Sequence, residues 1–194
     1  MFDNVAVTAA IFAAFGYISG SFLAAYFIPK WLYGIDIVVG SNDGNPGTAN
    51  VFKQVDAECG IAVIIIELLK GFLPVYIAKR YMDVNLMWFI PVLVAPVIGH
   101  AHSMFYNFKG GKAIAVSFGV LLGLVPYWMP VLLLAFFYIF YSLIIRITPH
   151  WRRSVITFIS WLIALIMTFR IKSICIAASI ISTIVVHKHI MAKD

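Results

Sequence analysis

Charged residues are scarce in this sequence. They make up 11% of its 194 residues, whereas a soluble domain has roughly 25%. Hydrophobic residues account for 63%, and the mean hydropathy is +0.99. The composition therefore excludes an ordinary soluble domain and predicts an all-α integral membrane protein.

Cysteine is also rare, and no cation stands near the N-terminus. The two cysteines, Cys59 and Cys175, belong to different apolar segments and show no metal-ligand spacing, so we expect free packing residues. No Lys or Arg precedes Lys30, which argues against a cleaved signal peptide and for an uncleaved first span. Nothing in the pattern requires a metal or another cofactor.

Long apolar runs divide the chain into candidate transmembrane helices. Because a span needs about 20 apolar residues, the sequence predicts a compact bundle of about seven helices in one membrane-embedded domain, residues 1–194, with five or six full spans as the alternative. Pro126 and Pro130 follow the fourth helix closely, so that helix is expected to reach only part of the way across. The predicted helices are Val5–Ile28, Cys59–Ile77, Leu86–Phe105, Ala113–Leu124, Trp128–Ile145, Ser154–Phe169 and Ser173–Val186.

Lysine and arginine predict the orientation of the bundle. With seven crossings and the N-terminus outside, cations concentrate on the inner side, which predicts a multi-pass protein with a cytoplasmic C-terminus. A membrane edge also accounts for the net charge of +6, so no nucleic-acid partner is expected. The inner side holds Lys30, Lys53, Lys109, Lys112, Arg146, Arg152, Arg153, Lys188 and Lys193; the outer side holds Lys79, Arg80, Arg170 and Lys172; Lys70 lies within a helix.

Two glycine-rich loops on the predicted inner side suit an anion. GSNDGNPGTANVFK, residues 40–53, combines glycines that allow an anion nest with amide, hydroxyl and ammonium donors. Its alternative role is a helix start, with Thr48 or Asn50 as the N-cap. FKGGK, residues 108–112, could equally fix the orientation and contact lipid headgroups. Together the loops favour a site for a phosphorylated molecule at the membrane surface.

Four motifs resemble those of the bacterial acylphosphate:glycerol-3-phosphate acyltransferase family. They are GSFLAAY at 20–26, GNPGTANVFK at 44–53, IELLKGFLPV at 66–75 and GHAHSMFYNFKGGKAIA at 99–115. The likeness covers roughly the first 125 residues. It implies a small enzyme of the bacterial inner membrane that transfers a fatty acyl group from acyl phosphate to glycerol 3-phosphate, giving lysophosphatidic acid for phospholipid synthesis without a cofactor. Its partners would be these two substrates and membrane lipids.

The resemblance and the residue chemistry together give a candidate site. No Ser-His-Asp arrangement is recognisable, and the H-x-x-x-x-D pattern of other glycerolipid acyltransferases is absent, so we expect direct attack by the substrate hydroxyl with a substrate phosphate oxygen taking the proton. The candidate catalytic residues are Lys112, Asn50 and Lys53. The candidate phosphate-binding residues are Ser41, Asn45, Gly47, Thr48, Gly110, Gly111, Lys109, Lys70 and His100, with Ser21 and His189 as further candidates.

Two of these candidates also have structural interpretations. Glu67 and Lys70 lie one helical turn apart inside a predicted span, where ionised groups usually face a cavity or each other. Mutual pairing is the favoured interpretation, and substrate contact by Lys70 is the alternative. His100 is expected either to pack as a hydrogen-bonded histidine or to support the site from behind.

The chain also departs from the family pattern. When Gly44 and Asn45 are aligned with the family motif, Asp43 stands where the family usually has Ser, and Ser41 lies two positions earlier. Either the chain carries a small insertion here or a carboxylate replaces the hydroxyl, and an unpaired carboxylate would repel phosphate. Lys53 replaces the usual Arg, and Ala113 replaces a glycine, a change expected to be mild. The last third fits poorly: RITP at 146–149 lacks the family's Ser, and the tail offers only His187 or His189 as stand-ins.

Two other functional classes stay open on the sequence alone. Polar groups within helices and Pro96 in the third span would suit a transporter or channel. A relative that binds lipid phosphate without turnover would fit the missing C-terminal motifs. The sequence does not indicate an oligomeric state.

Overall fold

Helices form most of the chain that the structure describes. The computed structural model describes residues 4–41 and 43–192, and within these ranges the chain forms helices and turns without a strand. The helices are α1 (Val5–Ser21), α2 (Ala24–Tyr33), α3 (Thr48–Gln54), α4 (Ala57–Ala78), η1 (Met87–Phe89), α5 (Ile90–Ala101), α6 (Ile114–Leu122), α7 (Met129–Ile139), the π-helical η2 (Phe140–Ile144), α8 (His150–Thr168) and α9 (Lys172–Met191).

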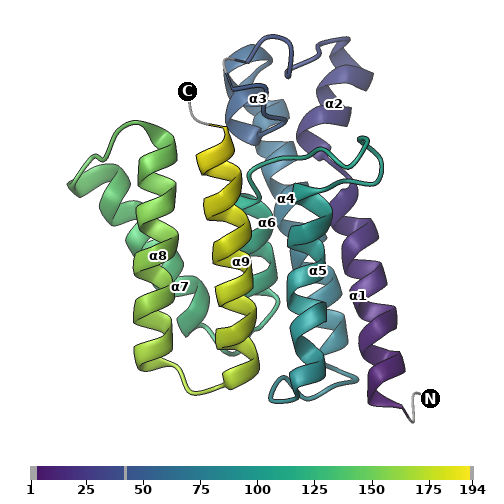
Figure 1. The fold of residues 1–194 in the computed structure, drawn as a ribbon. Coiled ribbons are helices and arrows are strands. Elements are labelled where there is room, and N and C mark those ends of the chain that lie inside the picture. Colours follow the sequence, from purple (N-terminus) through teal and green to yellow (C-terminus); the bar gives the residue numbers. More distant parts are fainter. Residues whose placement is uncertain (1–3, 42, 193–194) are drawn as a thin grey trace.

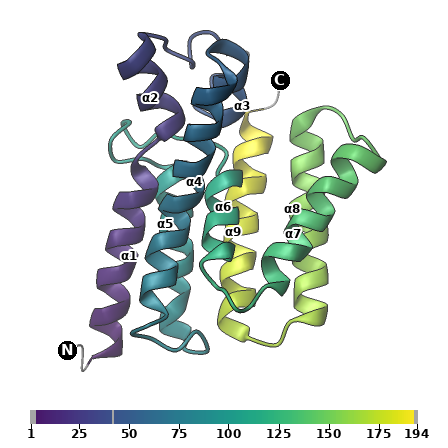
Figure 2. The same ribbon diagram turned by 180° about the vertical axis from the view of Figure 1, so that it is seen from behind.

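The long helices alternate in direction. From α1 onward, α4, α5, α6, α7, α8 and α9 run in turn down and up the bundle (Figures 1 and 2). The beginning of α1 lies at the lower end of Figure 1, and the end of α9 lies at the upper end. Residues 34–41, 43–56, 102–113 and 145–149 also lie at the upper end, so the two loops expected to hold phosphate share one end of the bundle, as the sequence predicted. Lys193 lies outside the described residues.

Helix lengths show which elements can cross a membrane alone. Among the described residues three helices, α4, α8 and α9, are long and apolar enough, and α1 with α2 would form a fourth span with a 43° bend. Two shorter apolar helices cover Met87–Ala101 and Met129–Ile144. Helix α6 has nine residues, which gives a rise of about 14 Å, so it reaches only part of the way, as predicted.

The prediction of one continuous first helix from Val5 to Ile28 is wrong. Phe22 and Leu23 leave the helical conformation, and the chain restarts as α2. The break is stabilised by side chains distant in sequence: Lys70 donates to the Phe22 carbonyl at 2.7 Å, and Ser103 donates to the Ser21 carbonyl. Buried carbonyls released from a helix need such donors, and apolar periodicity does not reveal them.

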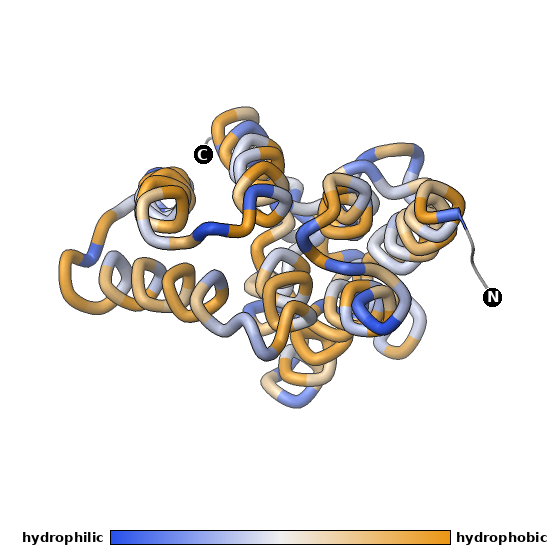
Figure 3. Tube along the Cα trace, turned by 90° about the horizontal axis from the view of Figure 1, so that it is seen from below, coloured by the Kyte–Doolittle hydropathy of each residue, from blue (hydrophilic) through white to orange (hydrophobic). Residues whose placement is uncertain are grey.

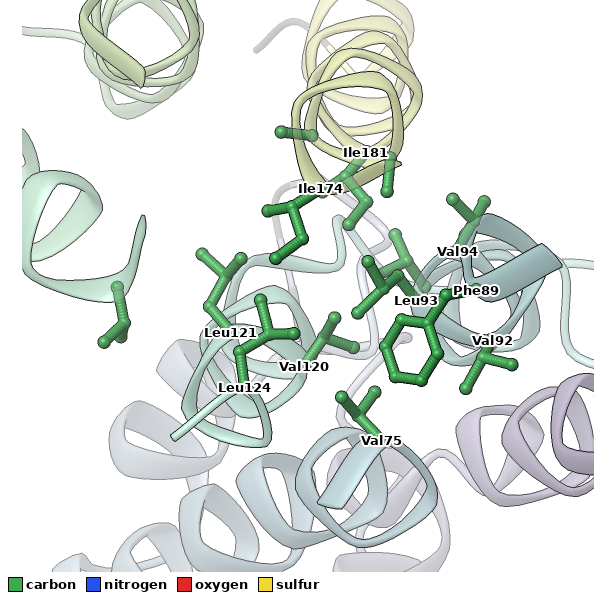
Figure 4. Packing of buried hydrophobic residues seen from close by; sticks show 14 of the residues in the cluster. Val75, Phe89, Val92, Leu93, Val94, Val120, Leu121, Leu124, Ile174 and Ile181 are labelled. Atoms are coloured by element: carbon green, nitrogen blue, oxygen red, sulfur yellow. The ribbon is translucent and has the colours of Figure 1, made fainter. Parts of the chain in front are cut away.

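A hydrophobic core lies between α4, α5, α6 and α9. Phe89 and Leu93 contribute to it from one side and Ile174 and Ile181 from another, as Figure 4 shows. Apolar residues also cover the outer faces of the helices, whereas hydrophilic residues concentrate in the connections (Figure 3). An apolar exterior around an apolar core is the pattern expected of a bundle surrounded by lipid.

Small residues allow the closest helix contacts. A Cβ atom at Gly20 of α1 would overlap the backbone of Pro96 in α5, and one at Gly119 of α6 would overlap the carbonyl of Leu68 in α4. Glycines at such crossings are typical of membrane bundles, where close backbone approach provides much of the packing energy. The second contact holds α6 against α4, which together form one wall of the cavity described next.

Candidate active site

Two cavities adjoin near the upper end of the bundle. The larger, about 560 Å³, is mostly apolar and lies between α3, α4, α6, α7 and the start of α8; the smaller, about 230 Å³, is polar and lies under the connection that follows α2. Four residues line both of them: Asn45, Ala49, Lys112 and His150. An elongated apolar group and a polar group could therefore meet beside Lys112.

Lys112 forms an ion pair with Asp43 where the cavities meet. Its Nζ lies 2.7 Å from Asp43 Oδ2, and the lysine side chain is only 10% exposed. Asp43 Oδ1 accepts from Asn50 Nδ2 at 3.2 Å and from the Asn45 N–H at 3.3 Å. The sequence left open whether Asp43 is paired, and the structure shows that it is. Burial raises the pKa of Asp43, but the hydrogen bond and charge of Lys112 and the amide donors outweigh burial, so the net pKa is lowered and the carboxylate is ionised at neutral pH.

The anion loop leads into α3 without a side-chain cap. Helix α3 begins at Thr48, with Gly47 in extended conformation as its N-cap residue, so the N-cap roles considered for Thr48 and Asn50 are wrong. The Asn50 side chain instead donates to the Asn45 carbonyl at 2.9 Å, which closes the loop. Thr48 and Gly47 line the apolar cavity.

The polar cavity gathers the remaining residues of this loop. Ser41 and Lys53 line it together with Asn45, Asn50 and Lys112. Lys53 lies in the last turn of α3 and its side chain is exposed, so its ammonium group can reach the cavity while staying hydrated. Five of the predicted site residues therefore surround one polar space.

The two glycines of FKGGK have a packing role. A Cβ at Gly110 would overlap the His100 carbonyl, and one at Gly111 would overlap the His100 ring. The Gly111 N–H donates to the His100 carbonyl at 3.1 Å, so the expected use of this amide for phosphate is not available in the structure. Lys109 is exposed and lies outside both cavities.

Ala113 adopts a left-handed backbone conformation with φ of 61°. This conformation costs about 1–2 kcal/mol for a residue with a Cβ and is nearly free for glycine. A glycine at this position, as in the family pattern, would avoid this cost. The expectation of a mild change at Ala113 is therefore wrong for the local backbone. Ala113 and the first two residues of α6, Ile114 and Ala115, line the apolar cavity.

A buried network of charged side chains supports the site from behind. Glu67 Oε2 lies 2.8 Å from Lys70 Nζ and 3.0 Å from His100 Nδ1. This confirms the pairing of Glu67 with Lys70. Lys70 lies outside both cavities, so its substrate contact is not supported, whereas Glu67 and His100 line the apolar cavity. Ser21 also lies outside both cavities. Its carbonyl accepts from the Ser103 hydroxyl, and its own hydroxyl accepts from the Met104 N–H at 3.4 Å.

Histidines from the last two helices approach the same place. His150, the first residue of α8, lines both cavities, and its ring lies 5.9 Å from the ring of His189 in α9. His189 is fully buried with its Nδ1 2.8 Å from the Val185 carbonyl, whereas His187 is exposed, so His189 is the tail histidine near the site. Sequence reasoning missed His150 and Tyr138; the available signal for His150 was a histidine directly after a proline with three arginines within four positions.

Comparisons with known proteins agree with this geometry. The model of the glycerol-3-phosphate acyltransferase family matches residues 10–192. A glycerol-3-phosphate acyltransferase of Hydrogenobaculum sp. is 37% identical over 132 residues, which cover 68% of this chain and 66% of that protein. One from Endomicrobium trichonymphae is 38% identical over 122 residues, which cover 62% of this chain and 59% of that protein. These alignments thus span less than two thirds of the relatives' length.

Solved structures extend the likeness over nearly the whole fold. The glycerol 3-phosphate form of the integral membrane acyltransferase PlsY superposes with a TM-score of 0.83 at 25% identity, covering 94% of this chain and 88% of that one. Its lysophosphatidic acid form gives 0.80 at 26% identity, covering 93% of this chain and 87% of that one. The family match therefore includes the last third, where the motifs depart from the pattern. This chain is an integral membrane protein that belongs to the glycerol-3-phosphate acyltransferase family.

Proposed function

We propose that the protein transfers a fatty acyl group from acyl phosphate to glycerol 3-phosphate and releases lysophosphatidic acid and inorganic phosphate. The main observation is the pair of cavities that share Lys112. The apolar cavity suits an acyl chain, and the polar cavity suits a small hydroxylated phosphate. The two solved structures of PlsY, a glycerol 3-phosphate form and a lysophosphatidic acid form, support the same substrate class.

The residues support a direct displacement at the acyl carbonyl. Lys112 would neutralise the phosphate of the acyl donor, and Asn45, Asn50 and Lys53 would orient the acceptor. The primary hydroxyl oxygen of glycerol 3-phosphate forms a bond to the carbonyl carbon while the carbon–oxygen bond to phosphate breaks. The hydroxyl proton passes to a substrate phosphate oxygen. Positioning and charge neutralisation would supply the catalysis, because the donor is already an activated mixed anhydride.

The test is an acyl-transfer assay on the purified protein in proteoliposomes. Palmitoyl phosphate and labelled glycerol 3-phosphate should give labelled lysophosphatidic acid at a rate that depends on both substrates. Palmitoyl coenzyme A should not replace the acyl phosphate. Folded protein that forms no product from either donor would contradict the proposal. Binding of the substrates without product would then indicate a non-catalytic relative, and solute flux would indicate a transporter.

We also propose that the end with both cavities faces the cytoplasm of a bacterial inner membrane. Eight described cations lie at or near this end and four at the other, which follows the positive-inside rule. In a protein whose Cys59 and Cys175 are replaced by alanine, Lys109→Cys should react with an impermeant maleimide only after spheroplasts are permeabilised. Arg170→Cys, at the opposite end, should react in intact spheroplasts. The reverse pattern would invert the orientation.

A further inference from the structure

Three donors that the sequence assigned to phosphate converge on one internal carboxylate. Lys112 Nζ, Asn50 Nδ2 and the Asn45 N–H all reach the oxygens of Asp43, at 2.7, 3.2 and 3.3 Å. We propose that Asp43 is an intramolecular competitor that occupies the anion site of the enzyme and must leave it before a substrate phosphate binds. The inference rests on the proposed function, because that function makes Lys112 the phosphate ligand.

The donor set identifies the site as one for an anion. An ammonium group, a side-chain amide and a backbone N–H supply hydrogen atoms, and the Asp43 carboxylate provides only acceptor oxygens. A phosphate oxygen accepts the same hydrogen bonds as a carboxylate oxygen. The two anions are therefore alternatives at these donors, and they cannot both approach Lys112 Nζ closely without repulsion.

Packing indicates which partner moves. Lys112 is buried between Gly111, which fits against the His100 ring, and Ala113, which is 1% exposed. Asp43 belongs to the connection between α2 and α3 and precedes Gly44, which is exposed and where an added Cβ would meet no atom within 4 Å. An incoming phosphate would therefore displace the carboxylate and leave the lysine in place.

The consequence is a lower affinity for phosphate than the donors alone would give. Lys53 and Lys112 bring two positive charges to the polar cavity, and Asp43 cancels one of them before substrate arrives. A substrate phosphate must break the Asp43–Lys112 pair and then tolerate the displaced carboxylate nearby. Asp43 would therefore raise the concentration of phosphate substrate at which the site fills.

The experiment measures phosphate binding directly and compares matched variants. Asp43→Ser removes the carboxylate, and Asp43→Asn keeps the shape while removing the charge. Asp36→Asn is the control, because it makes the same change of net charge in the Lys30–Asp36 ion pair, 3.1 Å long and outside both cavities. Isothermal titration of the full-length protein in detergent with inorganic phosphate gives Kd, and acyl-transfer kinetics give KM for each substrate.

We expect both Asp43 variants to bind inorganic phosphate about tenfold more tightly than the unaltered protein, with a matching fall in KM for a phosphate substrate, while Asp36→Asn leaves both unchanged. Unchanged or weaker phosphate binding by both Asp43 variants would overturn the proposal and would make Asp43 a positioning residue for Lys112. The titration needs no turnover. If the protein transfers acyl groups but the Asp43 variants bind phosphate with unchanged affinity, only the competition by Asp43 is refuted. If the Asp43 variants bind phosphate more tightly but no protein transfers acyl groups, only the proposed reaction is refuted.

Discussion

Lys112→Met is expected to lower kcat/KM for acyl transfer by about 10²–10³-fold, the loss typical when one preorganised charge donor is removed from an active site. Lys112 is the only cation that lines both cavities among the described residues, so no neighbour can take over its contact with a phosphate at their junction. Initial rates over a range of palmitoyl phosphate and glycerol 3-phosphate concentrations measure the effect.

The matched control for this loss is Lys109→Met. Lys109 belongs to the same FKGGK motif, and its replacement removes the same charge, but its side chain is exposed and lies outside both cavities. Its kcat/KM is expected to stay within about threefold of the unaltered protein, because only a screened surface charge is lost. Equal losses in the two lysine variants would show that the motif acts through its general charge, and the role given to Lys112 would fail.

Lys70→Met is expected to destabilise the protein by about 3–5 kcal/mol, because it leaves the buried Glu67 carboxylate without its ammonium partner. Glu67 is 1% and Lys70 5% exposed. The substitution also removes the donor to the Phe22 carbonyl at the break between α1 and α2. Unfolding in mixed detergent micelles, followed by circular dichroism against the fraction of denaturing detergent, measures the change in unfolding free energy.

Two further variants separate the loss of the Glu67–Lys70 ion pair from the loss of the other contacts of Lys70. Lys30→Met breaks the partly exposed pair with Asp36 and is expected to cost about 0–1 kcal/mol. The double variant Glu67→Gln with Lys70→Met removes the unpaired charge and is expected to recover much of the stability lost by Lys70→Met alone. If the double variant is as unstable as Lys70→Met alone, the lost stability comes from the unsatisfied Phe22 carbonyl and not from the unpaired Glu67 carboxylate.

The sequence predicted the membrane class and the two loops from residue types alone. Scarce charge and long apolar runs required a helical membrane protein, since lipid leaves the backbone few other solutions. The glycines and donors of residues 40–53, with the lysines of FKGGK, indicated an anion site, and Lys112, Asn45, Asn50 and Lys53 do surround one polar cavity. Pairing of Glu67 with Lys70 followed from their spacing of three residues on one helix.

Contacts between distant segments were decided only by the tertiary structure. Asp43 meets Lys112 across 69 positions of the chain, and the break after Ser21 depends on Lys70 and Ser103. His150 lines both cavities because α8 begins at the upper end of the bundle, where residues of α3 and Lys112 line the same spaces. Periodicity and local propensity describe how each segment packs as a helix. They do not specify which carbonyl or carboxylate from another segment will satisfy a buried donor, because that choice belongs to the packed bundle as a whole.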